Sequence, residues 1–419
     1  MKNIYSIFLA IPFFFISILN AQVVDYVSVG SSYSKQAFYK IGTGEETNIN
    51  NEVWDIAFSN LGGNDGGIFI NESSSFNSNP LEVYYPFHWV WSETITIDPE
   101  LINEENILYN PEKSWEDGAF NTIRDTSDSN DYGWGYYNSN NDNIEGILIY
   151  IIKKRDGSYM KIQILELAAG EYTFRYADLD GSNEQTVTLS KNEAGNDPLI
   201  FFSFNTGTTL DIPQDYDLIF TRYISPLDDG AGGTIPYIVT GVLLGPGTQG
   251  VAARGIDPST VDEADYAHLY SADPSTIGHE WKYFSFETGW NVLGDEAYFV
   301  QTKEGEKYKI VFTGFGGSTT GVTTLEKTYI GMVSVKNESK DKPALNISPN
   351  PCIGNILSFN NLPSTELSVL IHDSKGRLLY KAILNENKLS LPSNWSNGYY
   401  YVSFIDKSKV YTDRILLMR

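Results

Sequence analysis

The sequence predicts a mostly β protein with more than one domain. Aromatic residues make up 14 % of the 419 residues, with 28 Tyr and 22 Phe, and this content favours strands. Short apolar runs are separated by Gly, Asn, Ser and Asp, the residue types that tight turns require. The length is enough for two or three domains of ordinary size.

The N-terminus has the pattern of an export signal. Lys2 supplies a positive charge, the apolar run IYSIFLAIPFFFISIL follows, and Ala21 supplies a small residue at the cleavage point. We therefore predict a signal peptide over residues 1–21, with cleavage after Ala21. No later stretch reaches 18 consecutive apolar residues, so we predict no transmembrane segment.

Charge and cysteine content narrow the classes of partner. The formal net charge is −24, and a polyanion of this size repels nucleic-acid backbones and anionic lipids. We therefore expect no nucleic-acid partner. Cys352 is the one cysteine, so no disulfide within the chain and no cysteine-based zinc site is expected.

The region after the signal peptide repeats itself. The run EVWDIAFS at 52–59 matches DYDLIFT at 215–221, and AFYKIGTG at 37–44 matches IFFSFNTG at 200–207. We predict two tandem antiparallel β units, at 22–192 and 193–335. Whether they form two domains or two halves sharing one core is left open by the sequence.

Each unit also carries a late hairpin. Residues 146–165 and 295–312 both read as a strand, a charged turn with Gly, and a second strand. The first unit has a longer middle, Asn71 to Trp115. In the matched strands we expect Trp54, Phe58, Tyr216 and Phe220 in the core, while Asp55 and Asp217 accept hydrogen bonds from backbone donors.

The C-terminal part is a separate unit. Residues 336–343 (KNESKDKP) form a charged linker, and 344–419 carry short alternating strands that predict a small β-sandwich. The motifs Pro349-Asn350-Pro351, Gly398-Tyr399-Tyr400 and the terminal Arg414 and Arg419 resemble the C-terminal sorting domain of type IX secretion. The resemblance implies the type IX machinery as a partner, and secretion or surface display through the periplasm and outer membrane.

The two cargo units are similar to the HmuY family, haem-binding proteins of Bacteroidetes. The resemblance rests on Phe202-x-Phe204 with Thr206-Gly207, on the matched Trp54-Asp55 and Tyr216-Asp217 pairs, and on the hairpin YFVQTKEGEKYKIVFTGF. It implies an all-β fold whose loops clasp haem. Haem, or a host protein that carries it, would then be the partner.

Histidine is the ligand type that a haem site of this family implies. His268 and His279 lie in one loop of the second unit, flanked by Tyr266 and Tyr270, and we predict them as the haem and iron ligands. No histidine stands at 284–287, where the family has a ligand. His88 lies among aromatics in the first unit, in an aromatic-lined loop or a second haem site, and His372 lies in the sorting domain.

Catalytic patterns are weak. His279-Glu280 lacks the second histidine of a zinc protease motif, and no nucleophile elbow is present. Asp178 and Asp180 fit an Asp-Gly hairpin turn better than a glycosidase pair or a calcium loop. We therefore expect a non-enzymatic, exported binding protein that captures haem or a related tetrapyrrole. The alternative is a surface adhesion or other ligand-binding β module without haem ligation.

Overall fold

The structure, a computed structural model, describes residues 22–332 apart from 63, 64 and 88, and then 346–360, 367–373, 378–384, 387–406 and 409–418. The predicted signal peptide, the predicted linker and His88 lie outside these residues. The chain divides into two compact units, one ending at Ser334 and the other beginning at Val335. The expectation of a mostly β protein is confirmed, since all strand pairs described are antiparallel.

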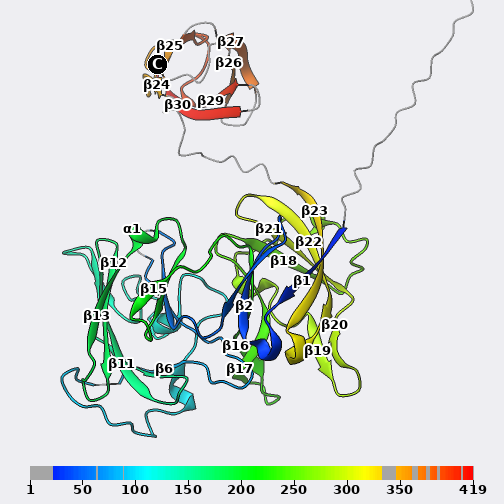
Figure 1. The fold of residues 1–419 in the computed structure, drawn as a ribbon. Coiled ribbons are helices and arrows are strands. Elements are labelled where there is room, and N and C mark those ends of the chain that lie inside the picture. The colour runs from blue at the N-terminus through cyan, green and yellow to red at the C-terminus, as the bar shows by residue number, and fades with distance from the viewer. Residues whose placement is uncertain are drawn as a thin grey trace, which may run out of the picture. The chain divides into compact units, whose positions relative to one another are not determined.

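Four sheets stack as layers in the first compact unit (Figure 1). In hydrogen-bonded order, sheet A contains β1 (Gln22–Ser28), β23 (Val322–Met332), β22 (Glu306–Phe315), β21 (Glu296–Gln301) and β18 (Gln249–Arg254). Sheet B contains β17 (Thr234–Leu244), β16 (Leu218–Asp228), β2 (Lys35–Lys40) and β3 (Glu45–Asn50). Sheet C contains β15 (Thr208–Leu210), β14 (Leu199–Ser203), β4 (Ile56–Ser59) and β5 (Ile68–Ile70).

Sheet D forms the outer layer next to sheet C. Its main path is β13 (Gln185–Ser190), β12 (Glu171–Asp178), β11 (Tyr159–Ala168), β10 (Ile149–Lys153), β6 (Glu82–Tyr84) and β7 (Ile107–Leu108), with β8 (Tyr136–Asn138) and β9 (Asn143–Glu145) beside it. A separate hairpin joins β19 (Lys282–Ser285) to β20 (Gly289–Val292). The short helical segments are η1 (Ser31–Tyr33), η2 (Glu104–Asn106), η3 (Ala119–Asn121), α1 (Lys191–Ala194), η4 (Glu263–Asp265), η5 (Pro274–Thr276) and α2 (Gly317–Thr320).

The two inner sheets are buried on both faces. In β4, Ile56 and Phe58 face sheet D while Ala57 faces sheet B. In β16, Leu218 and Phe220 face sheet A while Ile219 faces sheet C. Successive side chains of a strand point to opposite faces, so a strand between two layers needs an apolar residue at every position. This explains the uninterrupted apolar runs of the repeated motif.

Strand pairing crosses the boundary predicted at 192/193. The β14–β15 hairpin, expected in the second unit, pairs with β4. In return, β2–β3 pairs with β16, and β1 pairs with β23. The first lobe therefore holds sheets C and D, formed by residues 56–210, and the second lobe holds sheets A and B, formed by 22–50 and 218–332.

Each lobe thus contains a hairpin from the other repeat, β14–β15 in the first lobe and β2–β3 in the second, and this exchange of hairpins has a physical reason. Repeated sequence identifies equivalent strands, but equivalent strands offer equivalent pairing edges, so the pattern does not say which copy a hairpin joins. The sequence left open whether the repeats form two domains or two halves sharing one core. In the structure, the two lobes share an apolar seam where sheet B packs on sheet C. This seam is built around Phe38, Phe69, Phe201 and Ile219.

Matched residues of the two copies make matched hydrogen bonds. The Asp55 amide donates to Phe202 O at 2.9 Å, and the Asp217 amide donates to Tyr39 O at 3.0 Å. Asp55 Oδ2 accepts from the Phe204 amide at 2.6 Å, and Asp217 Oδ2 accepts from the Ile41 amide at 2.8 Å. The predicted role of both aspartates as acceptors of backbone N–H groups is confirmed.

Other local expectations also hold. Trp54, Phe58, Tyr216 and Phe220 are all buried. The two late hairpins are present as β10–β11 and β21–β22. The Asp178–Gly181 segment is the turn between β12 and β13, where the Gly181 amide donates to Asp178 O at 2.9 Å and Gly181 has a φ of 87°.

The second compact unit contains two antiparallel sheets. One joins β24 (Asn346–Ser348), β25 (Ile356–Asn360) and β28 (Lys388–Ser390), and the other joins β27 (Leu378–Leu384), β26 (Leu367–Asp373), β29 (Gly398–Asp406) and β30 (Lys409–Leu417). Their apolar faces share one core that includes Leu357, Val369, Val402 and the buried Cys352.

Candidate functional site

A pocket of about 90 Å³ lies in the seam between sheets B and C. Both lobes contribute to its wall, which is mainly apolar and rich in aromatic rings: Phe38, Trp54, Phe69, Trp115, Phe201, Tyr216 and Tyr223. Ring centroids are 5.0 Å apart for Trp54 and Phe201, and 6.1 Å apart for Phe69 and Trp115. The Trp115 indole also donates to Leu244 O at 2.8 Å, which ties the two lobes together at the pocket.

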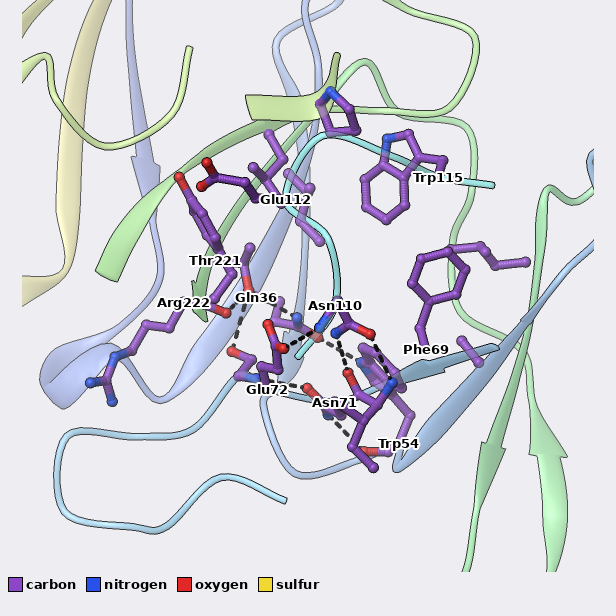
Figure 2. A pocket seen from close by; sticks show the side chains of 18 of the residues that line it. Gln36, Trp54, Phe69, Asn71, Glu72, Asn110, Glu112, Trp115, Thr221 and Arg222 are labelled. Carbon is purple, nitrogen blue, oxygen red and sulfur yellow. Dashed lines mark hydrogen bonds between the residues drawn. The ribbon is translucent and has the colours of Figure 1, made fainter. Parts of the chain in front are cut away.

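The polar side of the pocket comes from the longer middle of the first repeat. The side chain of Asn110 holds this segment by pairing with the backbone of Ile70, as a neighbouring strand would. Its side-chain amide donates to Ile70 O at 2.7 Å and its Oδ1 accepts from the Ile70 amide at 3.1 Å. This pairing holds the segment from Asn110 to Trp115 along β5, with Glu72, Glu112 and Trp115 around the pocket (Figure 2).

Glu72 is a buried carboxyl group between the lobes. Its Oε1 accepts from the Asn110 amide at 2.7 Å, and its Oε2 accepts from the Ile224 amide of β16 at 3.1 Å. Burial raises the pKa of Glu72 to about 7, because the charged form loses its hydration and the hydrogen bonds from Asn110 and Ile224 only partly replace it. Titratable groups shifted in this way mark candidate functional sites.

Glu112 lies on the opposite side of the polar wall and is half-buried. Its Oε2 accepts from the Ser225 hydroxyl at 2.7 Å. The one basic residue among those lining the pocket is Arg222, and Figure 2 shows its guanidinium pointing away from both carboxyl groups. Arg222 instead donates to Ser74 O at 2.8 Å and Ser75 O at 2.9 Å.

A chain of hydrogen bonds closes the inner end of the polar wall. The Trp54 indole donates to Gln36 Oε1 at 2.7 Å, and Gln36 Nε2 donates to Thr221 Oγ1 at 2.9 Å. Thr221 Oγ1 lies 3.3 Å from Ser73 Oγ. These hydroxyl groups are therefore engaged with each other and with an amide.

The two predicted ligands, His268 and His279, lie outside the set of residues that line this pocket. His268 is exposed just after η4. His279 is half-buried, and burial lowers its pKa, helped by the charge of Lys282. Its ring centroid is 6.5 Å from that of Tyr223, a residue of the pocket wall.

No metal-binding group is found within the described residues, in the sense of three or more His, Cys, Asp or Glu side chains placed to hold one ion. His88 lies outside the described residues, and His372 lies on β26 in the C-terminal unit. Within the same described part of the chain, no helix is long and apolar enough to span a membrane.

Sequence reasoning missed the polar half of the pocket. It identified Trp54 and Tyr216 only as core residues, and it noted the extra middle of the first repeat without assigning a role to Glu72 or Glu112. The available signal was that this insertion carries carboxyl and amide side chains directly after the buried β5 strand.

Comparison with known proteins identifies the C-terminal unit. A family model described as "Secretion system C-terminal sorting domain" matches residues 346–418. The search of curated proteins found no match.

Two solved structures share some similarity with the chain. One is apo PinO from Porphyromonas gingivitis, with 8 % identity, coverage of 75 % of this chain and 99 % of that chain, and a TM-score of 0.23. The other is PorZ, described as an essential surface component of the type-IX secretion system of Porphyromonas gingivalis, with 11 % identity and a TM-score of 0.17. That match covers 90 % of this chain and 55 % of the PorZ chain, so this chain spans little more than half of PorZ. TM-scores this low do not establish a shared fold.

The comparisons thus indicate how the protein is exported. The match over residues 346–418 shows that the protein carries a type IX sorting domain, which implies interaction with the secretion machinery and a location outside the cell or on its surface.

Proposed function

We propose that this exported protein is a binding protein that holds a small molecule, or a small group of a larger one, in the pocket between sheets B and C. The observation that carries the proposal is the composition of the pocket wall, which combines seven aromatic residues with a few fixed polar groups. Binding sites for small molecules are typically of this kind: preformed, concave, mostly apolar, and oriented by a few polar groups.

Two hydroxyl groups of the pocket wall, Ser73 and Thr221, support binding rather than catalysis. Thr221 Oγ1 accepts from Gln36 and lies within hydrogen-bond distance of Ser73, so neither hydroxyl is activated by an adjacent base. The type IX sorting domain implies a location outside the cell or on its surface, which supports a role as a carrier or surface receptor.

The test uses small probes of different charge. We expect ligand-observed NMR to show binding of at least one of phenol, tert-butanol, tetramethylammonium and acetate to the mature protein. Ala57 lies on the pocket wall and is fully buried, so Ala57→Leu should fill the pocket and abolish binding. Phe284→Ala, an exposed change outside the pocket, is the control.

Two results would overturn the proposal. The first is that no probe binds. The second is that a folded Ala57→Leu protein, verified by circular dichroism, binds as well as the wild type.

Haem capture remains a second candidate, suggested by the resemblance to the HmuY family. The observation that favours it is His279, whose burial lowers its pKa and so favours the neutral imidazole that ligates iron. The pocket of about 90 Å³ is far smaller than a tetrapyrrole, so haem would have to lie against the loop that carries His268 and His279.

Absorbance with added hemin tests this candidate. A shifted Soret band that weakens in both His268→Ala and His279→Ala would support it. An unshifted band, or a shift that persists in both variants, would exclude ligation by these histidines.

A further inference from the structure

The pocket holds two carboxyl groups that lack a positive partner within the described residues. Salt bridges are formed by many acidic residues elsewhere, such as Asp55 with Arg155 and Glu82 with Lys153, but Glu72 and Glu112 form none with a described lysine or arginine. An unpaired buried carboxylate is costly, since its hydration is lost without compensation by an opposite charge.

Glu72 illustrates how incomplete the compensation is. Its donors are two backbone amides, from Asn110 and Ile224, and the Asn110 side chain, and the group is buried in the seam. Glu112 adds a second carboxyl group to the same pocket and disfavours the charged form of Glu72.

The one basic side chain in the pocket wall is directed elsewhere. The Arg222 guanidinium donates to the carbonyls of Ser74 and Ser75, and it lies over the Tyr33 ring, 5.7 Å from its centroid. Figure 2 shows the guanidinium extending away from Glu72 and Glu112. The pocket is therefore electronegative.

The remaining wall is aromatic. Ring faces carry negative electrostatic potential and attract cations, most strongly for Trp, then Tyr and Phe. Trp54, Trp115, Tyr216 and Phe69 line the pocket together with the carboxyl groups. Aromatic rings combined with carboxylates are the usual surroundings of organic ammonium groups, whereas metal ions prefer a shell of oxygen ligands.

We propose that the pocket binds a small organic cation, namely an ammonium or methylated ammonium group that enters between the aromatic rings and pairs with Glu112 and Glu72. This assignment rests on the proposed binding function and names the chemical class of its ligand. The volume sets the size: about 90 Å³ is less than the roughly 150 Å³ of a cavity that takes up benzene. The bound group is therefore a compact head with few heavy atoms.

The experiment compares two probes of equal shape. Tetramethylammonium and tert-butanol have the same number of heavy atoms, but only the first is charged. We expect isothermal titration calorimetry on the mature protein to show tetramethylammonium binding about tenfold more tightly than tert-butanol, an advantage in the range of a desolvated cation–π contact.

The matched variants separate a local charge from the overall charge. Glu112→Gln keeps an oxygen acceptor for Ser225 and should remove the preference for the charged probe. Glu116→Gln neutralises an exposed carboxyl group outside the pocket wall and should leave the preference unchanged. Trp115→Leu should weaken tetramethylammonium binding, while Trp290→Leu, at a partly exposed tryptophan on the separate hairpin, should not.

The outcomes distinguish this inference from the function on which it rests. Equal affinity for the two probes, or an equal loss in Glu112→Gln and Glu116→Gln, would overturn the cation assignment. If tert-butanol or phenol binds in a manner that Ala57→Leu abolishes and tetramethylammonium does not bind, the small-molecule function stands and the cation assignment falls. If no probe binds, both fall.

Discussion

At the scale of single residues, Glu72 connects the two lobes. One carboxylate oxygen accepts from Asn110 in the first lobe and the other from Ile224 in the second. Its protonation state therefore affects the seam as well as the pocket. The folded pKa is raised to about 7 from an ordinary value of 4.5, so the folded state holds this proton more tightly than the unfolded state does.

The sign of the pH effect follows from this difference. The contribution of Glu72 to stability is fully present below about pH 4.5 and is lost as the pH rises to about 7. We expect the loss to be at most about 3 kcal/mol. Urea unfolding of the wild type and Glu72→Gln between pH 4 and 8 checks this.

Asp217 also makes stability fall as the pH rises, so the pH dependence of the wild type alone does not report on Glu72. The difference in unfolding free energy between the wild type and Glu72→Gln removes the contribution of Asp217, which both proteins share. The pKa of Asp217 is raised to about 6 by burial. Glu116→Gln serves as an exposed control. A pH slope that is identical in all three proteins would contradict the assignment.

The sequence pattern predicted the roles of some of these buried acidic residues but not of others. Asp55 and Asp217 were predictable because they sit at the start of recognisable strands, where backbone donors need acceptors. Glu72 was not, because one of its two donors, Ile224, lies 152 residues away. A local pattern carries no information about a partner that comes from a distant strand of the other lobe.

At the scale of elements, the N-terminal segment is fastened to the end of the second lobe. The Val29 amide donates to Gly321 O at 3.0 Å, just before β23 begins. Gly321 has a φ of 67°, and a Cβ atom there would lie 2.1 Å from Gly30 O. Backbone cannot yield to such a clash as a flexible side chain can.

We expect Gly321→Ala to destabilise the protein by more than about 2 kcal/mol, since it combines a left-handed backbone with a steric clash. Gly170→Ala is the matched control. Its φ is 80°, but a Cβ atom would meet nothing within 4 Å, so only the conformational cost of about 1 kcal/mol applies. Equal chemical denaturation midpoints for the two variants would contradict the importance of this contact.

Strands were predictable to a greater extent than their partners. The apolar runs around Ile56 and Leu218 and the Gly-containing turns marked elements correctly, because local chemistry determines them. The pairing of β14 with β4 was not predictable, because β4 and β16 present similar edges and only the three-dimensional packing selects between them.

At the scale of the whole molecule, the cargo behaves as one unit and the sorting domain as another. Removal of residues 336–419 should leave the main unfolding transition in place, because the C-terminal unit has a hydrophobic core separate from those of the sheets in the first compact unit. Removal of 22–50 should abolish it, because sheet A loses β1 and sheet B loses β2 and β3.

Differential scanning calorimetry of the two truncated proteins tests this. The expected result is an unchanged transition temperature for the first and no cooperative transition for the second. A protein lacking 22–50 that melts cooperatively near the wild-type temperature would show that the exchange is dispensable.

The buried ammonium of Lys327 has a consequence for how fast the protein folds. It lies in β23 and donates to Tyr39 Oη at 3.2 Å and to Ile41 O at 2.6 Å, and its bond to Tyr39 spans 288 positions of the chain. Contacts of such sequence separation slow folding, since the loop between them must close first. The second lobe cannot be completed until the last strand of the cargo is available. Until β23 is in place, sheet A and the hydrogen bonds of Lys327 to Tyr39 and Ile41 therefore stay unformed.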